Sequence, residues 1–407
     1  MTFCSRFSQS PHWKTREHPI AQLAPYRPTS SGEIPIIDLD RGAAIDRKHR
    51  LIEEYLGLKQ VDGLLIQNPA NFAWFTAGAE NVRQGTLEPV ASLFLTRDAR
   101  VVLTSNVHSG QLFDRELNGF GFQLKERPWQ ETRGVLCQDM CRGRNVLADT
   151  GPQSVDDELS DFRRILDDAE CDALRALSRD LTHAVDATAR AVQQGDRESE
   201  VAGHLSHRLL RHGITPLRMQ VMADFQGHRY RHWGYGEDPI NRHCVISAVG
   251  RRRGLCAAVT RSLCFGQPPA ETIEIHQAAT ILLATSIYFS KGGWAVSEIW
   301  KRIGRIYEKL GIAEEWRLAD QGETVGYDTS GMVMTPGESK SLATNMAIHW
   351  HPSVRFAATG ETILVRDDQP EWLTQPESWP MIVVNVKGDK LSCPDMLCRE
   401  TASGWES

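Results

Sequence analysis

Residues 245–271 read VISAVGRRRGLCAAVTRSLCFGQPPAE, and this stretch decides the fold. Two apolar runs flank a basic segment, Arg251–Arg253, that is followed by a glycine, a pattern typical of a β-hairpin with a turn at its tip. A solvated turn is the simple interpretation of the three arginines. The alternative is that they contact an anionic ligand near the mouth of a pocket.

Long helical patterns lie on both sides of this hairpin. Upstream, residues 170–193 have helical periodicity that stops at Gly195, and a second helix runs from after Asp196 to about 213. Downstream, residues 273–290 and 296–311 predict two further helices. Helices that flank an antiparallel hairpin indicate an α+β domain.

The N-terminal part of the chain predicts a smaller α/β unit. Residues 47–59 alternate apolar and charged residues at helical spacing. Four short apolar runs bounded by turn residues predict strands at 61–67, 92–96, 100–105 and 145–151.

These patterns divide the chain into four parts. Residues 1–45 are rich in Pro, Ser and Arg without periodicity and predict an extended arm. The α/β domain covers 46–165, the second domain covers 166–395, and 396–407 form a C-terminal tail.

Composition excludes several classes of protein. The chain has 407 residues, 41% of them hydrophobic, so it can bury the cores of two domains. A formal net charge of -6 argues against nucleic acid as a partner. We find neither a signal sequence nor a membrane span. The nine cysteines form no CxxC pair, which favours reduced thiols and a cytoplasmic location.

Six segments, in this order, resemble the creatinase, prolidase and aminopeptidase P family. They are VDGLLIQNPANFAWFTAG (61–78), ECDALR (170–175), QGDRESEVAGHL (194–205), AAVTRSLCFGQPPAE (257–271), QGETVGY (321–327) and WHPSVRFAATGETILV (350–365). The resemblance covers most of the chain from about 46 to 390. It implies a pita-bread domain, a curved antiparallel sheet with flanking helices, preceded by a smaller creatinase-like α/β domain. It also implies a homodimer.

The family's peptidases hold two divalent ions between two Asp, one His and two Glu, and their hydroxide attacks the peptide carbonyl. The resemblance places these five ligand positions on Ser247, Ala258, Asp320, His351 and Gly360. A shift of one residue would restore Glu361 but neither aspartate, because no acidic residue lies between Asp238 and Glu271. We therefore expect no dinuclear metal centre and no cofactor.

Creatinase itself works without metal, through a histidine that acts as general acid and base. His232 resembles this histidine, although a surface position that stacks on Trp233 is an equally simple interpretation. The family's second pocket histidine falls on Tyr327, which can donate a hydrogen bond but is a poor base at pH 7.

His349 and His351 are two residues apart on a predicted strand, so their side chains share one face. With Asp320, Glu361 and Cys256 they would form a relocated mononuclear metal site. The alternative is a polar strand face that fills an empty cavity. Trp233 and Trp350 flank the candidate histidines and are expected to form pocket walls or to pack in the core.

Three functions remain open at this point. The first is binding of a small polar molecule or short peptide, or metal-independent hydrolysis of its C–N bond. The residues assigned to it are catalytic His232, Tyr327 and Glu361, with a substrate pocket of Trp233, Asp320, His349, Trp350 and His351. The second is a metal-dependent Xaa-Pro dipeptidase or aminopeptidase, and the third is a catalytically inactive scaffold.

Overall fold

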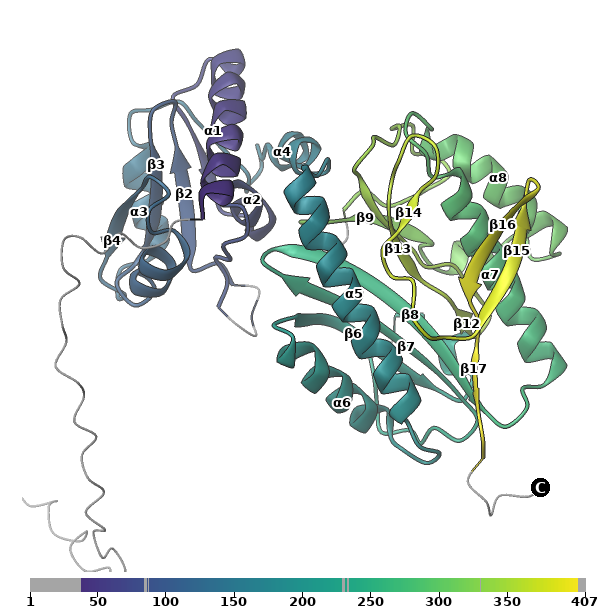
Figure 1. Cartoon of the computed structure of the whole chain (residues 1–407). Coiled ribbons are helices and arrows are strands. Elements are labelled where there is room, and N and C mark those ends of the chain that lie inside the picture. The colour runs from purple at the N-terminus through teal and green to yellow at the C-terminus, as the bar shows by residue number, and fades with distance from the viewer. Residues whose placement is uncertain are drawn as a thin grey trace, which may run out of the picture.

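The computed structural model describes residues 38–83, 86, 88–228, 231–232, 234–329 and 331–401. Its elements form a small N-terminal unit and a larger C-terminal unit (Figure 1). The N-terminal elements are α1 (Leu39–Lys59), β1 (Gly63–Ile66), α2 (Pro69–Phe75), β2 (Ala91–Leu95), β3 (Arg100–Ser105), the π-helix η1 (Gly110–Glu116), β4 (Phe122–Arg127), α3 (Arg133–Cys141), β5 (Val146–Ala148) and α4 (Asp156–Arg163).

The C-terminal unit contains four long helices and most of the strands. Its elements are α5 (Asp168–Ala191), α6 (Glu198–Arg211), β6 (Thr215–Ala223), the 3-10 helix η2 (Gln226–His228), β7 (His243–Arg252), β8 (Leu255–Phe265), α7 (Ala270–Phe289), α8 (Val296–Lys309), the 3-10 helix η3 (Glu315–Leu318), β9 (Gly322–Val325), β10 (Ala347–Trp350), β11 (Ser353–Val354), β12 (Ala357–Ala358), β13 (Glu361–Leu364), β14 (Glu371–Trp372), β15 (Met381–Val386), β16 (Asp389–Pro394) and β17 (Leu397–Arg399). The prediction of an α+β protein with a smaller α/β unit in front is confirmed.

The N-terminal sheet has the strand order β4-β3-β2-β1-β5. The four predicted strands are present, and β4 is a fifth strand that the sequence did not indicate. Helix α1 begins at Leu39 instead of near Arg47, because the side chain of Asp38 accepts a hydrogen bond from the Arg41 amide and caps the helix. Residues 39–45 are therefore helical and not part of an extended arm. The rest of the predicted arm lies outside the described residues.

The C-terminal unit is built around two four-stranded sheets, ordered β17-β8-β7-β6 and β14-β13-β10-β9. Backbone bridges between Cys256 and Gly326 and between Thr260 and Gly360 join β8 to the second sheet. Helices α5 and α6 lie against β6–β8, while α7 and α8 cover the second sheet on the other half of the unit (Figure 1). This is the expected curved sheet with flanking helix pairs.

Backbone hydrogen bonds hold both ends of the C-terminal unit in place. Helix α5 starts with a capping box, in which Asp167 and Glu170 each accept a hydrogen bond of 2.9 Å from the other's backbone amide. At the other end β17 pairs in parallel with β8. Residues 397–399, which we expected in a free tail, thus extend the first sheet.

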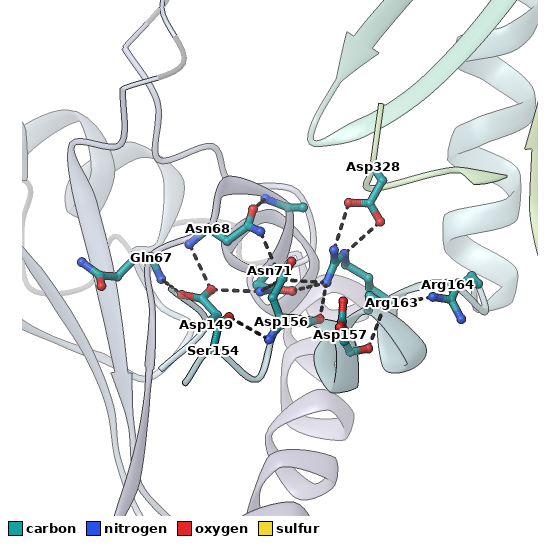
Figure 2. A network of polar contacts seen from close by, with 12 residues as sticks. Gln67, Asn68, Asn71, Asp149, Ser154, Asp156, Asp157, Arg163, Arg164 and Asp328 are labelled. Carbon is teal, nitrogen blue, oxygen red and sulfur yellow. Dashed lines mark hydrogen bonds and ion pairs between the residues drawn. The ribbon is translucent and has the colours of Figure 1, made fainter. Parts of the chain in front are cut away.

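Arg163, at the end of α4, connects the two units (Figure 2). Its guanidinium donates to Asn71 Oδ1 over 2.6 Å in the N-terminal unit and makes two hydrogen bonds of 3.0 Å to the Asp328 carboxylate, just after β9. The Asp149 carboxylate in turn accepts a hydrogen bond of 2.9 Å from the side-chain amide of Asn71. The Arg163 side chain is only 4% exposed, so this contact is shielded from water and salt.

Two large hydrophobic cores support the fold, and a smaller third cluster lies between the N-terminal sheet and α3. One large core runs without a break from the N-terminal unit through α5 and α6 to β6–β8, and the other fills the space between α7, α8 and the second sheet. All eight cysteines in the described part of the chain are free thiols. No helix among the described residues is long and apolar enough to cross a membrane.

Candidate functional site

A small cavity of about 40 Å³ lies on the inner face of the curved sheet. Side chains of β6, β7, β8 and β10 line it, together with the segments that precede β7 and β9. The strand register places Ser247 directly between Gln220 on β6 and Thr260 on β8. Alternate residues of each strand face the cavity, and the others face the helices.

His232 and Asp320 meet at this cavity. The imidazole Nε2 lies 2.9 Å from Asp320 Oδ1, and both side chains belong to the cavity lining. The His232 side chain is 54% exposed, so a ligand or solvent molecule can reach the ring. A carboxylate that orients an exposed imidazole is a common arrangement for proton transfer.

His349 on β10 and His351, directly after this strand, also line the cavity. Their rings stack with centroids 5.0 Å apart. Burial lowers the pKa of His349 well below its ordinary value, and the neighbouring His351 lowers it further. Burial also lowers the pKa of His351. Both imidazoles are therefore neutral near pH 7 and keep a lone pair that can accept a hydrogen bond or bind a metal.

Glu323 is the site residue that sequence reasoning missed. It lies on β9 opposite His349, its side chain is 1% exposed, and its carboxylate is 3.3 Å from Arg218 Nη2. The segment QGETVGY contained a signal, because a charged residue inside a short buried strand needs a polar partner. The family resemblance points instead to Asp320, three residues earlier, which precedes the strand.

Asp320, Glu323 and His351 form one potential metal-binding group. Their ligand atoms all lie within 4.8 Å of one another. His351 Nε2 is 3.9 Å from Asp320 and 4.0 Å from Glu323, and it has no hydrogen-bond partner among the described residues. One imidazole and two carboxylates suit a single divalent ion.

Ser247, Ala258 and Gly360 present no carboxylate to the inner face. The Thr260 hydroxyl donates a hydrogen bond of 3.0 Å to Ser247 Oγ. The backbone of Ala258 makes two hydrogen bonds with the Thr362 hydroxyl. The Ala258 amide donates to Oγ1 over 3.1 Å, and the hydroxyl donates to the Ala258 carbonyl over 2.7 Å. A Cβ atom on Gly360 would lie 2.7 Å from Thr260 Oγ1, so this position has no room for a side chain in the present arrangement.

Glu361 does not line the cavity, contrary to the prediction. It faces the opposite side of the sheet, where it accepts hydrogen bonds from Arg261 and from the Thr374 hydroxyl. Arg261 also contacts Asp186 on α5 over 3.0 Å. Burial raises the pKa of Glu361 to about 7, against the opposing effect of Arg261. Adjacent strand residues point to opposite faces, so Glu361 cannot share the orientation of Gly360.

Tyr327 and Trp350 also lie away from the small cavity. Tyr327 donates a hydrogen bond of 2.8 Å to Glu170, and burial raises its pKa well above the ordinary value. Trp350 faces the helices and donates to the Ser290 hydroxyl over 2.9 Å. Trp233 lies outside the described residues. Cys256 is fully buried and is no part of the Asp320 group.

A larger pocket of about 490 Å³ lies between the two units. Residues 68–82 of the N-terminal unit form one wall, and side chains that include Val249, Cys256, Tyr327 and Asp328 form the other. Arg218 lines both this pocket and the small cavity. The larger pocket has the volume of a typical small-molecule site.

Comparison with known proteins agrees with this architecture. Residues 172–369 match the model of metallopeptidase family M24, whereas no curated protein matches the chain significantly in sequence. A dipeptidase PepE from Mycobacterium ulcerans superposes with a TM-score of 0.71 at 14% identity, covering 88% of this chain and 99% of that one. A prolidase from Pyrococcus horikoshii superposes with a TM-score of 0.71 at 17% identity, covering 81% of this chain and 99% of that one.

An X-Pro aminopeptidase from Thermotoga maritima gives a TM-score of 0.67 at 17% identity, over 82% of this chain and 98% of that one. At these identities the superpositions establish a shared fold, and the family match covers the larger part of the C-terminal unit. The segment from 172 to 369 belongs to metallopeptidase family M24, and the chain as a whole has the fold of Xaa-Pro peptidases.

Proposed function

We propose that this protein uses the M24 fold to bind a small polar molecule and to act on its C–N bond without a dinuclear metal centre. The observation that carries the proposal is the chemistry of the inner face at Ser247, Ala258 and Gly360. Two adjacent divalent ions need carboxylates that bridge them and neutralise their charge. A hydroxyl, a methyl group and a glycine cannot do so.

The remaining polar groups favour proton transfer by side chains. His232 is exposed, and Asp320 holds its Nε2 at 2.9 Å. The imidazole can take a proton from a nucleophilic water or give one to a leaving nitrogen, while the carboxylate stabilises the charged ring. His232 and Asp320 are thus the proposed acid–base pair, and Tyr327 and Glu361 have no catalytic role in this proposal.

The size of the cavity limits where a ligand lies. A volume of about 40 Å³ holds little more than water molecules, so the bulk of a ligand must occupy the larger interdomain pocket. Arg218 borders both spaces and can contact an acidic or carbonyl group of the ligand. We therefore propose a ligand of dipeptide or guanidino-compound size that projects its reactive bond towards His232.

A metal-dependent Xaa-Pro peptidase is the second candidate. The group of Asp320, Glu323 and His351 favours it, because these side chains suit one divalent ion. The two candidates make different predictions for proline release from the dipeptide Ala-Pro with and without Mn²⁺. The first predicts no release that depends on Mn²⁺.

Binding of creatine and of Ala-Pro, measured by calorimetry after treatment with chelator, tests the first candidate. We expect at least one of them to bind, with affinity reduced about tenfold or more in His232→Ala. Hydrolysis of Ala-Pro that requires Mn²⁺ and is lost in Asp320→Asn would support the second candidate instead. Failure to bind either probe would favour an inactive scaffold.

A further inference from the structure

A second interdomain cavity, of about 590 Å³, opens at the tip of the β7–β8 hairpin. Its walls come from α1, the loop after α2, η1, the turn between α6 and β6, and the hairpin tip. We name it the arginine groove. Its charged lining consists of Arg41, Arg115, Arg251, Arg252, Arg253, Glu80 and Glu116. Five positive groups face two negative ones, so the lining carries a net charge of +3.

Two of the five arginines have carboxylate partners. Arg251 lies 3.2 Å from Glu80, whose carboxylate also accepts the Gly254 amide over 3.1 Å. Arg252 Nη1 lies 2.7 Å from Asp180 Oδ2 on α5, and Asp180 does not line the groove. The charge of Glu80 is therefore already neutralised by Arg251, and it does not compensate the other arginines.

The other three arginines make no ion pair with any residue in the described ranges. Arg41 donates through Nε to the Thr76 carbonyl, but its Nη2 is buried without a partner. Burial lowers the pKa of Arg41, Glu116 raises it, and Arg253 lowers it again. Arg41 and Arg253 are thus close enough to repel each other, with one carboxylate, Glu116, near them.

The backbone conformation at the hairpin tip brings Arg253 close to the N-terminal unit. Arg253 has a φ of 51°, in the left-handed region that glycine adopts with less strain. Its Cβ would lie 3.1 Å from a Cβ built on Gly78 in the facing loop, so the absence of a side chain at Gly78 lets the arginine approach the N-terminal unit. Arg253 and Gly254 are the two central residues of the β7–β8 turn, so the positive φ at both belongs to the turn, and the turn holds the Arg253 side chain against this loop.

We propose that the arginine groove binds a small anion with two adjacent phosphate groups. Guanidinium groups form charge-assisted, bidentate hydrogen bonds with phosphate oxygens. Three such groups without an ion-pair partner match a diphosphate better than a single carboxylate. The groove has the volume of a small-molecule site. The groove shares Glu80, Val82 and Arg251 with the larger interdomain pocket. The inference does not rest on the proposed acid–base pair, because neither His232 nor Asp320 lines the groove.

Isothermal calorimetry with inorganic pyrophosphate, ADP and citrate tests the proposal. We expect pyrophosphate and ADP to bind and citrate to bind at least tenfold more weakly. ADP tighter than pyrophosphate would mean that the groove also holds a nucleoside, and equal affinities would mean that it recognises the diphosphate alone. Affinity should fall about tenfold for each of Arg115→Gln and Arg253→Gln, the loss of one charge-assisted contact.

Arg305→Gln, an exposed charge removed from α8, is the matched control and should retain the affinity of the unchanged protein. Circular dichroism and thermal unfolding of the Arg115 and Arg253 variants show that the fold is intact. Absence of pyrophosphate and ADP binding, citrate binding as tight as that of pyrophosphate, or equal losses in Arg253→Gln and Arg305→Gln would each overturn the proposal.

Discussion

The hydroxyl of Thr260 donates a hydrogen bond of 3.0 Å to Ser247 Oγ across the β7–β8 hairpin. Each hydroxyl is thus partnered within the sheet, at the centre of the inner face. The family resemblance places two of its metal-ligand positions on this hairpin, at Ser247 and Ala258. The internal pairing of two neutral groups here is the structural basis for proposing a different chemistry.

Gly360→Ala should destabilise the protein by about 1–3 kcal/mol, the usual effect of overpacking. A Cβ at this position would lie 2.7 Å from Thr260 Oγ1 and 2.9 Å from His349 Cε1. Urea unfolding measures the change. Gly337→Ala is the control, because a Cβ at Gly337 meets no atom within 4 Å. An equally small effect of both substitutions would mean that the inner face has room for a side chain at 360.

Arg261→Met should destabilise the protein by about 3–5 kcal/mol, because it leaves buried Asp186 and Glu361 without their shared cation. The Arg261 side chain is 1% exposed. Arg142→Met removes an 80% exposed arginine and should change stability by less than about 0.5 kcal/mol. Chemical unfolding compares the two variants. A loss below about 1 kcal/mol in Arg261→Met would contradict the proposed role of this cluster.

The pH dependence of stability should change in Glu361→Gln. The pKa of Glu361 is raised in the folded protein to about 7, so between its unfolded value and 7 the folded state binds more protons than the unfolded state. The stabilisation from this group is complete below the unfolded pKa and is lost as the pH rises through about 7. Unfolding curves from pH 4.5 to 8 should therefore lose this downward trend in the variant. An unchanged profile would show that Glu361 does not titrate in this range.

His232→Ala should alter ligand binding but not stability. The side chain is 54% exposed, and surface substitutions usually change stability by less than about 0.5 kcal/mol. Thermal unfolding and calorimetry with creatine and Ala-Pro measure the two effects. A large stability loss with unchanged binding would assign His232 a structural role.

The order of helices and strands could be predicted from the sequence, because hydrophobic periodicity and helix caps depend only on residues that are close together in the chain. The hairpin at 245–265 and the helix after Asp167 follow directly from such signals. The early start of α1 was missed because its cap, Asp38, lies in a segment whose composition indicates an extended chain.

The site was only partly predictable, because the face on which a strand residue lies depends on register. A shift of one residue moves a side chain to the other side of the sheet, which is why Glu361 lies with Arg261 and not beside Gly360. Tyr327 turns away from the cavity after Gly326, whose φ of 112° ends β9. Asp320 and His232 come together from distant segments, and only the resemblance to a family pointed to both.

Metal content tests the central claim most directly. The protein should be incubated with Mn²⁺ or Zn²⁺, freed of loosely bound ions by gel filtration, and analysed for metal per chain by plasma mass spectrometry. We expect no tightly held pair of ions, because Ser247, Ala258 and Gly360 supply no bridging carboxylate. Two ions retained per chain would contradict it.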